Sequence, residues 1–186
     1  FFLFIVGMSI TFAYSAKKQR GISGDVYKKI ISRTLKLIFL GLFLAAFTVH
    51  FPFIKDLSTL RIPGVLQRIG VVFFIASLLF LNFNWKVLLG IFLGILILYW
   101  FLLTQIPING AAPLMTVDSN LPAVIDLNLL TSNHTYKSNY DPEGRLSTLP
   151  SIATTIFGMF LGMILLNKSS EPKRKLVRII GIGVIA

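Results

Sequence analysis

Apolar residues gather along this chain in six long runs that shorter polar segments separate. The runs cover Phe1 to Ala16, Leu35 to Phe53, Val65 to Leu81, Val87 to Ile106, Leu149 to Leu166, and Leu176 onward. A helix needs about 20 apolar residues to cross the ~30 Å hydrocarbon core of a bilayer. Backbone polar groups in hydrocarbon must pair within their own segment, so runs of this length predict helices. The pattern therefore predicts an all-α, polytopic transmembrane helix bundle with about six membrane segments.

The two outermost runs are incomplete as spans. The chain opens on "FFLFIVGMSITFAYS", which lacks the charged leader and the cleavage site of a signal peptide, and it ends on "LVRIIGIGVIA". We therefore expect a fragment whose first and last membrane segments are truncated. Residues 1–186 are predicted to form a single, partial membrane-embedded domain.

Composition agrees with a membrane protein. Of the 186 residues, 55% are hydrophobic and only 13% are charged, whereas about a quarter of the residues in soluble domains are charged. There is no cysteine, which excludes disulfides and thiolate metal sites, and the two histidines do not suffice for a protein zinc site. We expect no metal cofactor.

Positive charge falls on one side of the predicted bundle. One set of connections holds two acids and thirteen basic residues, namely Lys17, Lys18, Arg20, Lys28, Lys29, Arg33, Lys36, Lys86, Lys168, Lys173, Arg174, Lys175 and Arg178. The opposite side holds five basic and five acidic residues, so the net charge of +11 belongs to the first side. Lysine and arginine favour cytoplasmic loops. The basic loops 17–36 and 167–178 are thus predicted to be cytoplasmic, and because the charge flanks membrane helices, nucleic acid is not an expected partner.

The connection over residues 107–148 then faces the outside. It is rich in Pro, Asn, Asp, Ser and Gly and is much longer than an ordinary connector. Loops of this kind usually bind a ligand or cap a cavity. Within it, "NLPAVIDLNLL" is expected to form a short amphipathic helix on the membrane surface.

The stretch "YDPEGRLSTLP" places Asp141 and Glu143 just before an apolar run. One interpretation is structural: Asp141 caps a helix, Pro142 is its first residue and Glu143 lies in its first turn. The other is functional, because two carboxylates at the mouth of a bundle can hold a cationic group such as the ammonium of an amino sugar. The two interpretations are compatible.

A second polar cluster lies in "LRIPGVLQRIGVVFF". Arg61, Gln67 and Arg68 surround the start of the third apolar run. Arg68 can extend to the membrane surface, or it can line a buried site that binds an anion or a carbonyl group. In the outer loop, His134 is either a solvated side chain or a group for proton transfer, and a solvated side chain is the commoner case.

These motifs carry a resemblance to a known family. "LRIPGVLQRIGVVFF" and "YDPEGRLSTLPSIATTIFGMFLGMIL", with "FFLFIVGMSI" before them and "VIDLNLLTSNHTY" between them, are similar in the same order to the heparan-alpha-glucosaminide N-acetyltransferase family and its bacterial relatives. The resemblance spans nearly the whole chain. It implies a polytopic enzyme that moves an acetyl group from cytosolic acetyl-CoA, its co-substrate, to the amine of an amino sugar or glycan on the outer side.

The resemblance also implies roles for residues. Asp141 and Glu143 are the expected catalytic carboxylates, which orient the amine or support its base. The expected substrate-binding residues are Arg61, Gln67, Arg68, Asp126 and His134. The catalytic histidine of the family lies upstream of the segment that matches Phe1, so this fragment is expected to be inactive alone, and His134 is not assigned that part.

Location and partners follow from the same resemblance. The bacterial relatives imply the inner membrane, with the lipid bilayer and an amino sugar or glycan acceptor as partners, while self-association into a homo-oligomer is left open. The alternative function is a membrane transporter or binding protein for amino sugars, in which the same polar groups bind the sugar without acetylating it.

Overall fold

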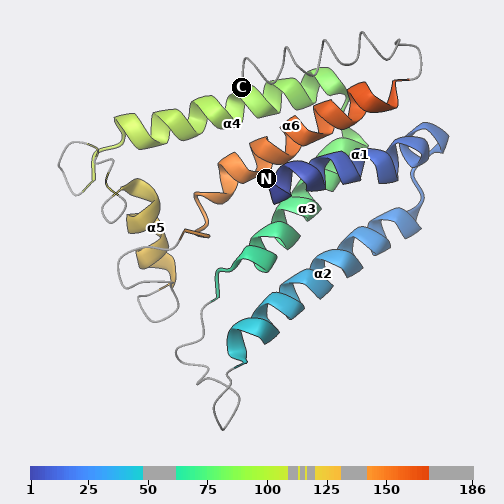
Figure 1. The fold of residues 1–186 in the computed structure, drawn as a ribbon. Coiled ribbons are helices and arrows are strands. Elements are labelled where there is room, and N and C mark those ends of the chain that lie inside the picture. Colours follow the sequence, from blue (N-terminus) through green and yellow to red (C-terminus); the bar gives the residue numbers. More distant parts are fainter. Residues whose placement is uncertain (48–61, 109–112, 114–115, 117–119, 131–141, 168–186) are drawn as a thin grey trace.

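The computed structural model describes residues 1–47, 62–108, 113, 116, 120–130 and 142–167 (Figure 1). In chain order the helices are α1 (Phe2–Arg20), α2 (Gly24–Ala46), α3 (Val65–Asn82), α4 (Trp85–Gln105), α5 (Leu121–Leu130) and α6 (Thr148–Leu166). These described ranges hold no β-strand, so the predicted all-α class is confirmed.

Three helices have the length and composition of membrane spans. They are α3, α4 and α6, with mean hydropathies of 1.9, 2.6 and 2.0, and they coincide with the third, fourth and fifth predicted segments. Helices α1 and α2 include basic residues within their bounds and are not among the candidate spans. The sixth predicted segment lies outside the described residues. The chain is thus an integral membrane protein with three candidate spans among the residues described, and the number of six stays a prediction.

The ends of the helices differ from the ends of the apolar runs. Helix α2 begins at Gly24, well before the predicted Leu35, and α1 continues past Ala16 to Arg20. Lysine and arginine are good helix formers, so the charged turns stay helical even though they are unsuited to lipid. Gly21 separates the two helices, since its φ of 101° is a left-handed conformation that favours glycine.

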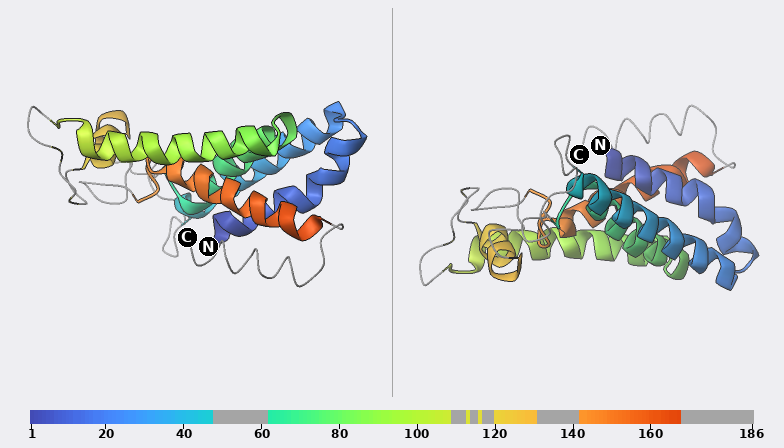
Figure 2. Two further views of the ribbon diagram at one scale, coloured as in Figure 1. Left: turned by 90° about the horizontal axis from the view of Figure 1, so that it is seen from above. Right: turned by 90° about the horizontal axis from the view of Figure 1, so that it is seen from below.

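Helix α5 forms where the outer loop was predicted to be helical. The side chain of Asn120 caps it by accepting a hydrogen bond from the backbone N–H of Ala123 at 3.0 Å. Apolar and polar positions are not separated onto two faces of α5, so the expectation of an amphipathic helix is wrong. Seen from above and below, α5 lies beside the end of α4 that is remote from the α1–α2 connection (Figure 2).

Helices α1 and α6 run parallel and make the closest helix pair of the bundle. A Cβ on Gly7 would collide with the carbonyl oxygen of Thr155, and one on Gly158 would collide with that of Phe4. Small residues let helix backbones approach within a membrane. Thr11 fastens the pair by donating from its hydroxyl to the carbonyl oxygen of Met159 at 3.3 Å.

Helix α3 lies at the centre of the bundle and contacts α1, α2 and α6. It packs antiparallel to α2, with Gly41 against Gln67 and Gly70 against Ile38. Helix α4 covers the other side of α6, where Phe92 stacks on Phe157 at a ring separation of 6.0 Å. The buried core is formed by apolar residues of α1, α2, α3, α4 and α6.

Alternating helix directions sort the connections into two ends of the bundle. At the first end, called the basic end, the Lys18 ammonium donates to the carbonyl oxygens of Phe80 and Phe83. These three residues line a pocket to which Met163, near the end of α6, also contributes. At the second, called the α5 end, the start of α3 meets residues 142–147, which precede α6. The predicted grouping of the 17–24 and 83–86 connections on one side is therefore found in the fold, whereas the side of the membrane that each end faces stays a prediction.

Candidate functional site

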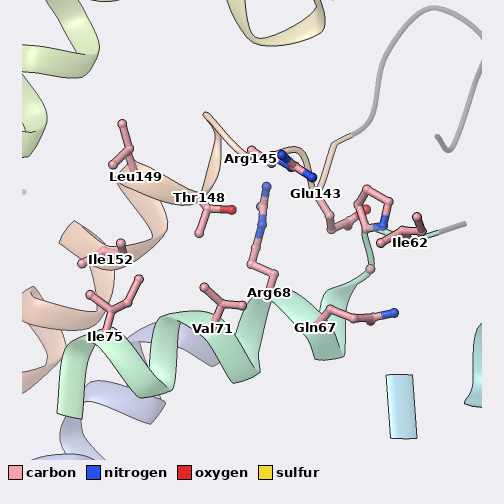
Figure 3. Close-up of a pocket in the computed structure, with 12 residues that line it drawn as sticks. Ile62, Gln67, Arg68, Val71, Ile75, Glu143, Arg145, Thr148, Leu149 and Ile152 are labelled. Atoms are coloured by element: carbon pink, nitrogen blue, oxygen red, sulfur yellow. The ribbon is translucent and has the colours of Figure 1, made fainter. Parts of the chain in front are cut away.

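The candidate site begins with the first turn of α3. Gly64, which follows Pro63, is the N-cap residue and has an extended conformation. The backbone N–H of Arg68 donates to the carbonyl oxygen of Gly64 at 2.9 Å and closes the first turn. This places the Arg68 side chain at the α5 end, where it extends from α3 toward residues 142–148 (Figure 3).

Residues 142–147 form a turn that precedes α6 and is rich in hydrogen bonds. The Ser147 hydroxyl donates to the carbonyl oxygens of Gly144 at 2.9 Å and Pro142 at 3.3 Å. The Thr148 hydroxyl donates to the carbonyl oxygen of Gly144 at 2.9 Å. Nη2 of Arg68 adds bonds to the carbonyl oxygens of Pro142 at 2.7 Å and Gly144 at 3.4 Å, and to the Ser147 hydroxyl. The turn is thus held by hydrogen bonds among its own residues and by hydrogen bonds from Arg68 of α3.

The structure corrects the interpretation of this stretch as a helix start. Helix α6 begins at Thr148 with Ser147 as its N-cap residue, and no acidic residue lies in its first turn. Pro142 and Glu143 therefore lie in the turn and not in a helix. The reason is that the carbonyl oxygens of Pro142 and Gly144 are bonded to side chains, so they do not enter a helical ladder.

A cavity of about 380 Å³ opens between this turn and α3 (Figure 3). Its polar wall contains a carboxylate, two guanidinium groups, an amide and a hydroxyl, and its remaining wall is apolar. The lining residues are Ile62, Pro63, Gly64, Gln67, Arg68, Val71, Ile75, Glu143, Arg145, Thr148, Leu149 and Ile152. A largely apolar concavity with a few convergent polar groups is the usual form of a small-molecule site.

Gln67 occupies a cradle formed by two glycines. A Cβ on either Gly41 or Gly64 would collide with the Gln67 side-chain oxygen. The amide nitrogen Nε2 is buried and has no hydrogen-bond partner among the residues that the structure describes. A buried donor of this kind is costly unless a ligand or water satisfies it. Gln67 is thus a lining residue of the cavity whose amide nitrogen is buried and keeps unused donor capacity.

Asp126 reaches the site from α5 and is fully buried. Its Oδ1 accepts a hydrogen bond from the backbone N–H of Arg145 at 2.8 Å. A Cβ on Gly144 would overlap its carboxylate, so Asp126 lies directly against the turn. Asp126 is not among the residues that line the cavity.

Of the predicted site residues, the structure brings Gln67, Arg68 and Glu143 together around one cavity and places Asp126 behind the turn. The predicted residues Arg61, His134 and Asp141 lie outside the described residues. No three His, Cys, Asp or Glu side chains gather as a metal site within the described ranges. The expectation that no metal is used stays a prediction.

Sequence reasoning missed Gly144, Ser147 and Thr148. A Ser-Thr pair just before an apolar run is a typical helix-start signal and was available for the last two. It also missed Tyr99 of α4, which lies within electrostatic range of Arg68 and Asp126. Nothing in the sequence distinguishes Tyr99 within its apolar run.

Electrostatics at the cavity combine both signs of charge. The Glu143 carboxylate can hold an ammonium group, and the guanidinium of Arg145 and the Gln67 amide can bind oxygen atoms of a ligand. The apolar wall of Val71, Ile75 and Ile152 can cover the face of a ring. The arrangement suits a small molecule that carries both an amine and hydroxyl or carbonyl groups.

Comparison with known proteins relates the chain to one enzyme family. The family model described as "Heparan-alpha-glucosaminide N-acetyltransferase, catalytic" matches residues 1–183. Heparan-alpha-glucosaminide N-acetyltransferase of Homo sapiens is 27% identical over 231 aligned residues, which cover 95% of this chain and 34% of the human protein. The protein of the same name from Mus musculus is 30% identical over 227 residues, with the same two coverages. The chain spans about one third of the length of these curated relatives.

Proposed function

The chain belongs to the heparan-alpha-glucosaminide N-acetyltransferase catalytic family, and from this premise we propose that it forms part of a transmembrane acetyltransferase whose acceptor site is the cavity at the α5 end. The donor is cytosolic acetyl-CoA. The acceptor is the amine of an amino sugar or glycan on the outer side. The observation that carries the proposal is the meeting of Glu143, Arg68 and Gln67, three residues of two distant motifs, around one cavity.

The reaction sets requirements that such a cavity can meet. The neutral amine attacks the thioester carbonyl, the carbon–sulfur bond breaks, and the products are an amide and coenzyme A. The acceptor enters as an ammonium ion and must lose a proton before its lone pair can attack. A positioned general base contributes roughly 10²- to 10⁴-fold to such a step.

Glu143 is the described residue best suited to the amine. Its carboxylate belongs to the cavity wall, so it orients the ammonium group and supports the base that removes the proton. We assign Asp141 the same part, two residues away in the motif. A carboxylate that is partly removed from water binds a paired cation strongly.

The remaining polar groups bind the rest of the substrates. Gln67 donates from Nε2 to a hydroxyl or carbonyl oxygen, and a donor to the developing oxyanion contributes about 2.7 to 4 kcal/mol. Arg68 belongs to the same wall, and we assign Arg68 and Arg61 to positioning the donor. We assign His134 to the outer acceptor site.

The two ends of the bundle then serve two compartments. Thirteen of the eighteen basic residues lie within residues 17–36, at Lys86 or beyond α6, so we place the basic end in the cytosol, where it meets the anionic donor. The α5 end faces the outside. A bacterial inner membrane is the location that we propose.

The Glu143→Gln variant of the full-length protein tests this function. Transfer of labelled acetyl groups from acetyl-CoA to glucosamine should fall about tenfold or more, since the amide cannot hold an ammonium group as a carboxylate does. Asp25→Asn is the matched control, because Asp25 is an exposed acid of α2 near the basic end. Unchanged turnover in Glu143→Gln would contradict the proposal.

The same preparation separates an enzyme from a carrier. In sealed vesicles, the proposed enzyme yields acetylated glucosamine that depends on acetyl-CoA. A carrier would accumulate unmodified glucosamine without acetyl-CoA and would form no acetylated product. That outcome would contradict the acetyltransferase function and favour a transporter.

A further inference from the structure

The turn at residues 142–147 is held by charged residues from two other elements. Arg68 of α3 donates to the carbonyl oxygens of Pro142 and Gly144. Asp126 of α5 accepts from the backbone N–H of Arg145 at 2.8 Å. Glu143 lies between these attachment points and contributes to the cavity wall. The backbone on both sides of Glu143 is therefore fixed by residues that are distant in sequence.

The contact of Asp126 is close and buried. Its side chain has no exposed surface, and its carboxylate fills the space in which Gly144 would carry a side chain. Gly144 does not have a left-handed backbone; among the described glycines, Gly21 alone has a positive φ. The glycine at position 144 is thus required for space, and the group that occupies the space is the Asp126 carboxylate.

Burying a carboxylate away from water is unfavourable unless hydrogen bonds compensate it. The Asp126 carboxylate receives such a bond from the Arg145 N–H at the point where α5 meets the turn, and Tyr99 of α4 lies within electrostatic range of Asp126 and of Arg68. It does not line the cavity. Its contacts are with the backbone that carries Glu143, so its effect on a bound substrate is indirect.

We propose that Asp126 is a positioning residue that docks helix α5 onto the 142–147 turn and thereby fixes the orientation of Glu143 in the cavity. Helix α5 thus contacts the turn through a buried carboxylate. The consequence for catalysis rests on the proposed acetyltransferase function, whereas the docking of α5 does not.

Cysteine accessibility tests the docking without any assay of activity. The chain contains no cysteine, so Leu149→Cys places one thiol in the cavity wall of a full-length protein that is freed of other cysteines. In detergent, the reaction rate of this thiol with a small maleimide reports opening of the turn. Adding Asp126→Ala should raise the rate about tenfold, because a lost charge-assisted hydrogen bond increases local opening by that order. Asp25→Asn should leave the rate unchanged.

Asp126→Asn provides a graded second variant. The amide keeps one oxygen that can accept from the Arg145 N–H, so the labelling rate should lie between those of the parent and Asp126→Ala. If Asp126→Ala does not fold, Asp126→Asn alone makes the test. A labelling rate that neither folded variant raises would overturn the proposal.

Kinetics of acetyl transfer distinguish positioning from general stability. In folded Asp126→Asn, kcat with glucosamine should fall about tenfold while the KM for acetyl-CoA stays within about twofold, because only the acceptor side is disturbed. A KM for acetyl-CoA that rises about as much as kcat falls would overturn the positioning role. If the parent protein acetylates no amine but Asp126→Ala still raises the labelling rate, the docking stands and the proposed function fails.

Discussion

Nη2 of Arg68 donates to the carbonyl oxygen of Pro142 at 2.7 Å, across 74 positions of the sequence. The same nitrogen reaches the carbonyl oxygen of Gly144 and the hydroxyl of Ser147. These acceptors lie on both sides of Glu143 along the chain. An arginine whose position in an apolar run suggested an anion site is therefore also the link between α3 and the turn that carries the candidate catalytic carboxylate.

Arg68→Lys should disrupt this link although the charge is kept. The planar guanidinium reaches several acceptors at once, whereas an ammonium group on a flexible stem cannot reproduce that geometry. Losing one or two hydrogen bonds from a charged donor costs about 1.5 to 3 kcal/mol each, so kcat/KM for acetyl transfer should fall about tenfold or more. Arg20→Lys, in the last turn of α1, is the matched control and should retain activity. Full activity in Arg68→Lys would show that charge alone suffices.

Gly144→Ala should destabilise the protein because its methyl group meets the Asp126 carboxylate. Overpacking of this kind costs about 1 to 3 kcal/mol. The cost should shrink when Asp126 is also replaced by alanine, with a coupling of about 1 kcal/mol or more between the two changes. Thermal unfolding of the parent, both single variants and the double variant in one detergent measures this coupling. Additive effects of the two substitutions on the free energy of unfolding would show that the cost of Gly144→Ala does not arise from contact with Asp126.

The arrangement of helices could largely be predicted from the sequence, because hydropathy indicates which segments suit a membrane. Apolar runs of span length located α3, α4 and α6, and the alternation of charged connections placed Lys18 and Lys86 at the same end of the bundle. Hydropathy records which residues suit lipid and not which residues form helical hydrogen bonds. For that reason the start of α2 at Gly24 was not predicted.

The candidate site could be predicted from the sequence only in part. Motifs identified Gln67, Arg68 and Glu143 as chemical groups, and the fold brings them to one cavity. No periodic sequence pattern indicates that Arg68 and Asp126 bond to backbone groups, because each contact depends on how a turn folds back over a helix. The turn's own hydrogen bonds explain why Pro142 and Glu143 do not start a helix as predicted, since they occupy carbonyl oxygens that a helix would require.

Gln67→Leu should separate function from stability. The buried Nε2 has no hydrogen-bond partner among the described residues, and such a donor costs about 1 to 3 kcal/mol. A leucine of similar size removes that cost, so the melting temperature should stay equal or rise. Acetyl transfer should nevertheless fall about tenfold if the amide binds a substrate oxygen. Unaltered acetyl transfer would leave Gln67 as a packing residue between Gly41 and Gly64.

Gly7→Ala should weaken the bundle at the pair of α1 and α6. The new methyl group meets the carbonyl oxygen of Thr155, which belongs to a helix backbone and cannot move aside easily. The expected loss is about 1 to 3 kcal/mol of unfolding free energy. Gly94→Ala on α4 is the control, because nothing lies within 4 Å of its Cβ position. There the same substitution should stabilise the helix by up to about 1 kcal/mol, and equal melting temperatures for the two variants would contradict the close packing.

Lys28→Cys and Arg145→Cys should react from opposite sides of the membrane. Both positions are exposed, and they lie toward the basic end and at the α5 end, respectively. The excess of lysine and arginine on the connections of the basic end predicts that the thiol of Lys28→Cys faces the cytosol. A membrane-impermeant maleimide applied to intact cells should therefore label the Arg145→Cys variant and spare the Lys28→Cys variant, while a permeant maleimide labels both. Labelling of both variants by the impermeant reagent would place the two ends in one compartment. The proposed acceptor cavity and the basic end, where we propose that the donor binds, would then no longer be separated by the bilayer, and acetyl transfer across the membrane would lose its structural basis.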